Sequence, residues 1–173
     1  HNFYGDLKDL EAATLEDAQG EILQKRVEDF HKLADSLFDP HQVRRHHKLR
    51  IAAKHLRYAA ELFALGEETD LPAAAKEIAA MQSYLGEVHD CDVWIVDLKR
   101  GLTSTKRRSL VNSERHAAIW LMSQFVRRRS KAFRSALELY DQWQVNDFLH
   151  RLVGDGQPAI ETTGVPEPNR IET

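Results

Sequence analysis

A row of cationic side chains recurs at helical spacing within the segment HHKLRIAAKHLRYAAELF, residues 46–63. Successive steps of three, four and three residues place these side chains on one side of a helix. The row consists of His47, Arg50, Lys54 and Arg57. It spans about 15 Å at the helical rise per residue. Because no Asp or Glu occurs between Asp39 and Glu61, the row has no acidic partner nearby in the sequence.

These residue types favour binding of a phosphate-rich anion. Arginine offers a planar fork of donors that matches phosphate oxygens, lysine adds a compact charge, and histidine adds a further donor. Several such donors in a line suit a ligand with repeated phosphates. Arg44 lies just upstream and extends the row. The alternatives are a solvated face whose stems cover apolar neighbours, or ion pairs with acids on adjacent helices.

The same segment carries an apolar stripe, which predicts that one side of the helix packs in a core. This stripe is offset from the cationic row by roughly a quarter to a third of a turn. Its members are Leu49, Ala53, Leu56, Ala60 and Phe63. One side of this helix therefore packs, and another side holds cations.

Apolar residues recur at three- and four-residue steps along most of the chain, which predicts an all-α fold. Asp39-Pro40 is a helix-start signal, and Gly66 and Gly101 are stop signals. We expect helices over 14–37, 39–66, 70–101, from Ser104 or Ser113 to about 140, and a short one over 146–153. Long amphipathic helices joined by short turns predict an antiparallel four-helix bundle.

Length and composition indicate one helical domain with a tail. A chain of 173 residues can bury a core without disulfides or a structural metal. We expect the bundle to occupy residues 1–153. Residues 154–173 hold three of the five prolines and lack apolar periodicity, so we expect a flexible tail there.

Charge and cysteine content narrow the class of protein. The net charge of −3 argues against a general nucleic-acid binder, but residues 41–58 and 99–134 are strongly basic. The single cysteine, Cys91, cannot form an internal disulfide. No apolar run approaches the length of a membrane span. We therefore expect a cytoplasmic protein with no membrane partner.

A second polar row is expected on the helix that begins at Ser104 or Ser113. Its members follow three- and four-residue spacing: His116, Trp120, Ser123, Arg127, Lys131 and Arg134. We predict that this row faces the first one. The consecutive residues 127–129 are all arginines and must point in three directions, so only one of them belongs to the row.

One short group of residues has side chains that could support catalysis. His89, Asp90 and Asp92 are suitable metal ligands, and a metal-dependent phosphohydrolase is therefore one alternative function. The chain has no HExxH motif, no cysteine pair, no glycine-rich phosphate loop and no nucleophile with a base. We therefore predict no catalytic residues, no metal and no cofactor. Glu61 and Asp90 are interpreted as partners that position basic side chains, and Gly86 as a small residue that lets helices approach.

The segments HKLRIAAKHLRYAAELF and MQSYLGEVHDCDVW together resemble the CHAD family, the conserved-histidine α-helical domain. The resemblance includes Tyr58 and Glu61 in the first segment, and Gln82, Gly86 and His89 in the second. It implies a helical bundle that binds inorganic polyphosphate through a basic surface and performs no catalysis. It also implies an association with polyphosphate bodies.

The predicted polyphosphate-binding set combines the resemblance with both rows. It comprises His47, Arg50, Lys54, Arg57, Tyr58, Arg44, His89, Arg127, Lys131 and Arg134. A nucleic-acid-binding or helical interaction protein is the other alternative, but only Tyr58 and Trp120 are placed to stack on bases.

The resemblance covers one half of the family's usual arrangement. Family members contain two four-helix halves, whereas this chain shows one pair of motifs. Either a second half lies outside this sequence, or two chains pair as a homodimer.

Overall fold

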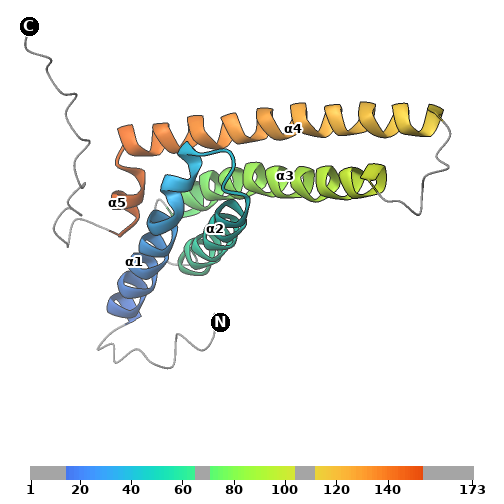
Figure 1. The fold of residues 1–173 in the computed structure, drawn as a ribbon. Helices are drawn as coiled ribbons and strands as arrows, with labels where there is room; N and C mark the ends of the chain where they lie inside the picture. The colour runs from blue at the N-terminus through green and yellow to red at the C-terminus, as the bar shows by residue number, and fades with distance from the viewer. Residues whose placement is uncertain (1–14, 65–70, 104–111, 154–173) are drawn as a thin grey trace, which may run out of the picture.

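The structure, a computed structural model, describes residues 15–64, 71–103 and 112–153, and these ranges are helical apart from short turns (Figure 1). The elements are α1 (Leu15–Ala34), the 3₁₀ helix η1 (Asp35–Phe38), α2 (Val43–Phe63), α3 (Leu71–Thr103), α4 (Asn112–Val145) and α5 (Phe148–Val153). The described ranges contain no strand, so the predicted all-α class is confirmed. The tail predicted over 154–173 lies outside the described residues.

Helix α2 begins at Val43, later than the start predicted at Asp39-Pro40. The Asp39 carboxylate instead accepts a hydrogen bond from the His41 backbone N–H at 2.9 Å and another from the Gln42 side chain at 3.2 Å. These hydrogen bonds lower the pKa of Asp39. Asp39 therefore closes a turn ahead of the helix and does not cap the helix itself.

Helices α3 and α4 run beyond their predicted ends. Gly101 lies inside α3, which continues to Thr103, and α4 continues past Tyr140 to Val145. An interior glycine costs about 1 kcal/mol relative to alanine but ends a helix only where it turns left-handed. The predicted stop at Gly101 was therefore wrong. The left-handed turn falls at Asp147, between α4 and α5, where φ is 49°.

Consecutive helices pack antiparallel, and the predicted bundle is confirmed. Arg45 near the start of α2 bonds to Asp35, at 3.0 Å between Nη1 and Oδ2, and to the Lys32 carbonyl at the end of α1. Helix α3 packs along both α2 and α4. Figure 1 shows α3 between these two helices. Helix α3 thus presents one side to each neighbour.

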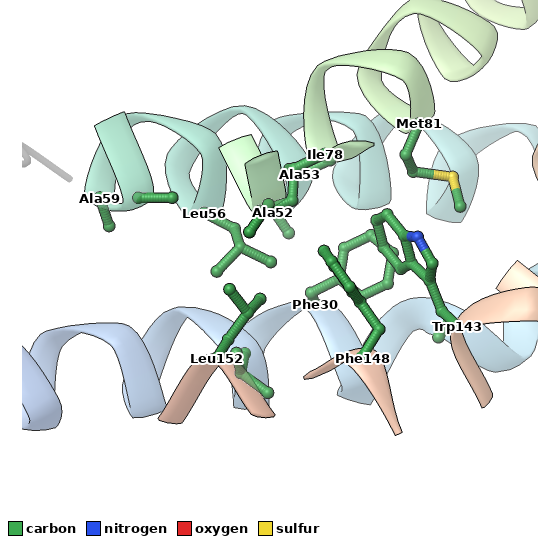
Figure 2. Packing of buried hydrophobic residues seen from close by; sticks show 14 of the residues in the cluster. Phe30, Ala52, Ala53, Leu56, Ala59, Ile78, Met81, Trp143, Phe148 and Leu152 are labelled. Carbon is green, nitrogen blue, oxygen red and sulfur yellow. The ribbon is translucent and has the colours of Figure 1, made fainter. Parts of the chain in front are cut away.

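The core lies where α1, α2, the first half of α3 and the last half of α4 meet. Phe30, Leu56 and Ile78 are completely buried there (Figure 2). Trp143 of α4 packs against Phe30 and stacks on Phe148 of α5, with ring centroids 5.6 and 4.5 Å apart. Its indole N–H donates to Glu77 of α3 at 3.1 Å. Helix α5 therefore closes one end of the core.

Helices α3 and α4 extend together beyond α1 and α2 as a two-helix arm (Figure 1). The arm comprises residues 92–103 and 112–131, and no side chain described in these ranges is buried. Trp94 stacks on Phe125 across the two helices, with ring centroids 5.7 Å apart. Val96 and Ile119 remain 52% and 44% exposed.

The homodimer suggested by the sequence remains a prediction.

No helix in the described part of the chain is long and apolar enough to cross a membrane.

Candidate functional site

The cationic row of α2 lies along the seam with α3, and we call His47, Arg50, Lys54 and Arg57 the seam row. Leu49, Ala53 and Leu56 are completely buried on the packing side of α2, which fixes the rotation of the helix. All four members of the seam row are half-buried. The stems are therefore held by neighbouring side chains while part of each side chain stays accessible.

Contacts with α3 set the register of the seam. The rings of His47 and His89 lie 4.5 Å apart between centroids. One turn along, the Nε atom of Arg50 lies 3.8 Å from the position that a Cβ atom on Gly86 would take. Because the helices are antiparallel, the next turn brings Lys54 level with Gln82. The structure thus brings together residues from both segments of the sequence resemblance.

The middle of the seam row carries positive charge that no acid among the described residues neutralises. Neither Arg50 nor Lys54 forms an ion pair within the described ranges. The Lys54 ammonium lies 5.7 Å from the centroid of the Tyr58 ring, and Tyr58 is 41% exposed. Arg57 differs, because its guanidinium pairs with Glu61 at 3.3 Å. The available charge is therefore concentrated at Arg50 and Lys54.

Several buried polar atoms at the seam have no hydrogen-bond partner among the described residues. They are His47 Nδ1, Arg57 Nε and Gln82 Oε1. A buried donor or acceptor without a partner costs roughly 1–3 kcal/mol. The seam therefore retains unused hydrogen-bonding capacity next to its unpaired cations.

Burial and neighbouring charges at the seam disfavour a positive charge on His47. The pKa of His47 is lowered, first by burial and then by the nearby His89 and Arg50. A neutral imidazole keeps one donor and one acceptor. An anion beside His47 would oppose this effect and raise the pKa of His47.

Other predicted residues lie away from the middle of the seam. Arg44 is exposed one turn ahead of His47. Asp90 is exposed and makes no hydrogen bond or ion pair with the rest of the described chain. Glu61, the other predicted positioning residue, does contact a member of the seam row through Arg57.

The predicted row on α4 does not face the seam. Arg127, Lys131 and Arg134 are exposed on the side of α4 opposite the buried Ala132 and Ala136. That side points away from α3, whereas α2 packs on the other side of α3. The structure therefore separates these arginine and lysine side chains from the seam row by the whole width of α3.

The three consecutive arginines of α4 point in different directions, as their spacing predicts. Arg128 pairs with Glu87, with 3.0 Å between Nη2 and Oε2. Arg129 pairs with Asp92, with 2.6 Å between Nε and Oδ1, and also donates to the Pro40 carbonyl at 2.8 Å. Of these three arginines, only Arg127 is exposed without an ion pair to the described residues.

Sequence reasoning missed the structural roles of His46 and Arg129. His46 is buried, donates through Nε2 to the Ser36 carbonyl at 2.8 Å, and packs on Phe133 of α4. Arg129 joins α3, α4 and the turn before α2. Both contacts depend on which helices are neighbours. The only sequence signal was that each basic residue stands at a position where the helical spacing predicts an apolar one.

The candidate metal ligands on α3 are not gathered into a site. His89 lies against His47, and the Asp92 carboxylate is held by Arg129. Across the described ranges, no group of three or more potential ligands converges.

The fold and the seam define a helical-bundle protein with a cationic surface between two antiparallel helices. The chain belongs to the CHAD family: residues 5–99, more than half of its 173 residues, match the family model described as CHAD domain. The resemblance seen in the sequence is thereby confirmed. Comparisons with curated proteins and with solved structures find no match.

Proposed function

We propose that this protein is a binding module for inorganic polyphosphate, which it holds along the seam row. The observation that carries the proposal is the charge of Arg50 and Lys54, which are half-buried beside α3 and form no ion pair with any described residue. If the seam row were only a solvated surface, these side chains would be fully exposed. If it were only structural, they would form ion pairs with acidic residues. Membership of the CHAD family supports the same ligand class.

The geometry suits a linear polyanion better than a single phosphate. Neighbouring members of the seam row are separated by about 4.5–6 Å along the helix axis. A flexible chain of phosphates can therefore place successive anionic groups at successive cations. His89 and Gln82 add polar atoms along the same line from the α3 side of the seam, and the His89 ring lies against the His47 ring of α2.

The decisive experiment combines Arg50→Gln and Lys54→Gln in one variant. Each neutralised phosphate contributes about −0.7 to the slope of log K against log salt for single-stranded nucleic acid. If polyphosphate behaves similarly, losing two contacts flattens the slope by about 1.4 and weakens binding at low salt by about tenfold or more. Titrations of long-chain polyphosphate at several salt concentrations measure both effects.

A matched control removes the same amount of charge from the two helices that form the seam. Lys48 and Lys76 are exposed on α2 and α3, away from the seam. The variant with Lys48→Gln and Lys76→Gln is expected to keep most of the affinity. An Arg50 and Lys54 variant that is folded by circular dichroism and binds as tightly as this control would contradict the proposal.

Two further measurements separate the alternatives. A length-matched single-stranded RNA that binds as tightly as polyphosphate would favour the nucleic-acid alternative. Phosphate release from polyphosphate in the presence of Mg²⁺ or Mn²⁺ would favour the phosphohydrolase alternative. We expect weaker RNA binding and no phosphate release.

A further inference from the structure

Helix α4 presents a second cationic surface that the seam does not use. No Asp or Glu occurs between Glu114 and Glu138. Within that stretch, Arg128 and Arg129 are occupied by carboxylates of α3. Arg127, Lys131 and Arg134, which we call the α4 outer row, are exposed and form no ion pair with the described part of the chain.

The α4 outer row has the arrangement of a binding surface. Its members follow steps of four and three residues, so their charges share one side of the helix. Trp120 lies on the same side, about two turns toward the N-terminus, and is 61% exposed. A surface that only keeps a protein soluble carries both signs of charge interspersed. This side of α4 carries one sign over more than 20 residues.

Acidic side chains divide the α4 outer row from the seam row. Around α3, the order of side chains from the seam toward α4 is His89, Gly86, Asp90 and Glu87. Asp90 is exposed, and Glu87 is the partner of Arg128. A polyanion that leaves the seam by this route meets like charge. The two cationic surfaces are therefore separate and not parts of one continuous groove.

We propose that the α4 outer row is a second polyphosphate-binding surface, so that one protein engages two separate polyphosphate segments and crosslinks long chains. This inference rests on the proposed function of the seam. It assigns a ligand contact to residues outside the stretch that matches the family model, which ends at residue 99. When one surface has bound a long polyphosphate chain, the second surface can bind the same chain intramolecularly. The apparent affinity for long chains is therefore higher than that for short chains.

The test compares an outer-row variant with a seam variant. The outer-row variant carries Arg127→Gln, Lys131→Gln and Arg134→Gln, all at exposed helix positions where glutamine is well tolerated. The seam variant carries Arg50→Gln and Lys54→Gln. A control for total charge carries Lys32→Gln, Lys48→Gln and Lys76→Gln, again at exposed positions. Circular dichroism checks that each variant is folded.

Light scattering during titration with long-chain polyphosphate reports crosslinking. We expect scattering from the unmodified protein and the charge control to rise at intermediate ratios and to fall when polyphosphate is in excess. We expect no such rise from the outer-row variant, although it still binds. Calorimetry with tripolyphosphate, which is too short to crosslink, should show the number of bound ligands per protein fall by half in that variant.

The outcomes separate this inference from the proposed function. Crosslinking by the outer-row variant at the level of the charge control overturns the second surface and leaves the seam proposal standing. A seam variant that binds no polyphosphate at all also overturns it, because the α4 outer row then binds nothing by itself. Absence of binding by the unmodified protein overturns both proposals.

Discussion

Arg50 of α2 lies over Gly86 of α3, so that a Cβ atom on Gly86 would sit 3.8 Å from the Arg50 Nε atom. That separation is an ordinary van der Waals contact, and no backbone atom of α2 lies as close. The interpretation of Gly86 as a residue that lets the helices approach is therefore wrong. Gly86 instead leaves room for a methyl group in ordinary contact with the Arg50 side chain.

Substitutions of Gly86 should separate stability from binding. We expect Gly86→Ala to raise the free energy of unfolding by up to about 1 kcal/mol, because alanine favours a helix interior over glycine. Its binding of polyphosphate should change by less than about twofold, a small energy on the affinity scale. A bulkier Gly86→Leu should displace Arg50 and weaken binding. Urea unfolding and titration with polyphosphate measure the two effects.

Gly20 of α1 supplies the control, because a Cβ atom there would meet nothing within 4 Å. Gly20→Ala should give a similar gain in stability and leave binding unchanged. If Gly86→Leu binds like the Gly20→Ala variant, the position of Arg50 over Gly86 is irrelevant to the ligand.

Stability should fall on mild acidification through His47. Burial lowers its pKa in the folded state below the ordinary histidine value, so the folded state favours neutral His47. The unfolded state binds the proton more readily, and stability is lost as pH falls from above 6.5 through the lowered pKa. His55 acts in the same direction. Urea unfolding at about pH 7.5 and about pH 5.5 brackets the ordinary histidine pKa.

The variant His47→Gln should lose part of this pH dependence and keep the part due to His55. An unchanged pH dependence in this variant would show that His47 titrates alike in the folded and unfolded states.

Polyphosphate binding should show the opposite pH trend to stability. A bound polyanion raises the pKa of His47, so the complex takes up protons and affinity increases as pH falls. The groups facing His47 are His89 and Arg50, and the bound phosphates offset their repulsion. Titrations across the same pH range test this trend. His47→Gln combined with His89→Gln should flatten it, and equal flattening by His55→Gln would argue against a role of the seam histidines.

The ion pair between Arg129 and Asp92 should matter for stability and not for binding. Each of its side chains is only 14% exposed. We expect Arg129→Ala to lower the free energy of unfolding by about 2–3 kcal/mol, because it leaves Asp92 and the Pro40 carbonyl without a donor. Thermal or urea unfolding measures this loss.

Arg128→Ala is the matched comparison, because Arg128 pairs with Glu87 but is 65% exposed. Solvent screens exposed ion pairs, so this variant should lose little stability. Equal losses in the two variants would mean that burial of the Arg129 pair contributes nothing.

Much of the fold followed from periodicity, because local patterns decide where a helix forms. The apolar stripe of α2 predicted Leu49 and Leu56 in the core, and both are completely buried. Helix ends were predicted less well where several local signals competed. Asp39 formed hydrogen bonds within a turn, and Gly101 lies inside α3, which continues to Thr103.

The seam row could be predicted from the spacing of its residues in the sequence, because its members lie on a single helix. The separation of the α4 outer row from the seam could not be predicted from the sequence, because it depends on which side of α3 each helix packs against. The same limit explains why the roles of Arg129 and His46 were missed. Their partners lie far away in sequence, and only tertiary packing brings Arg129 to Asp92 and His46 to Phe133.

No side chain described in the arm, residues 92–103 and 112–131, is buried, which implies a gradient of local stability along both helices. Regions with few buried contacts open at a lower free-energy cost than the core to which they are joined. Amide hydrogens near Thr103 and Asn112 should therefore exchange with solvent well before those near Leu85 and Tyr140. Because α4 continues unbroken from the arm into the core, the α4 outer row spans the boundary between a fast-exchanging and a slow-exchanging segment.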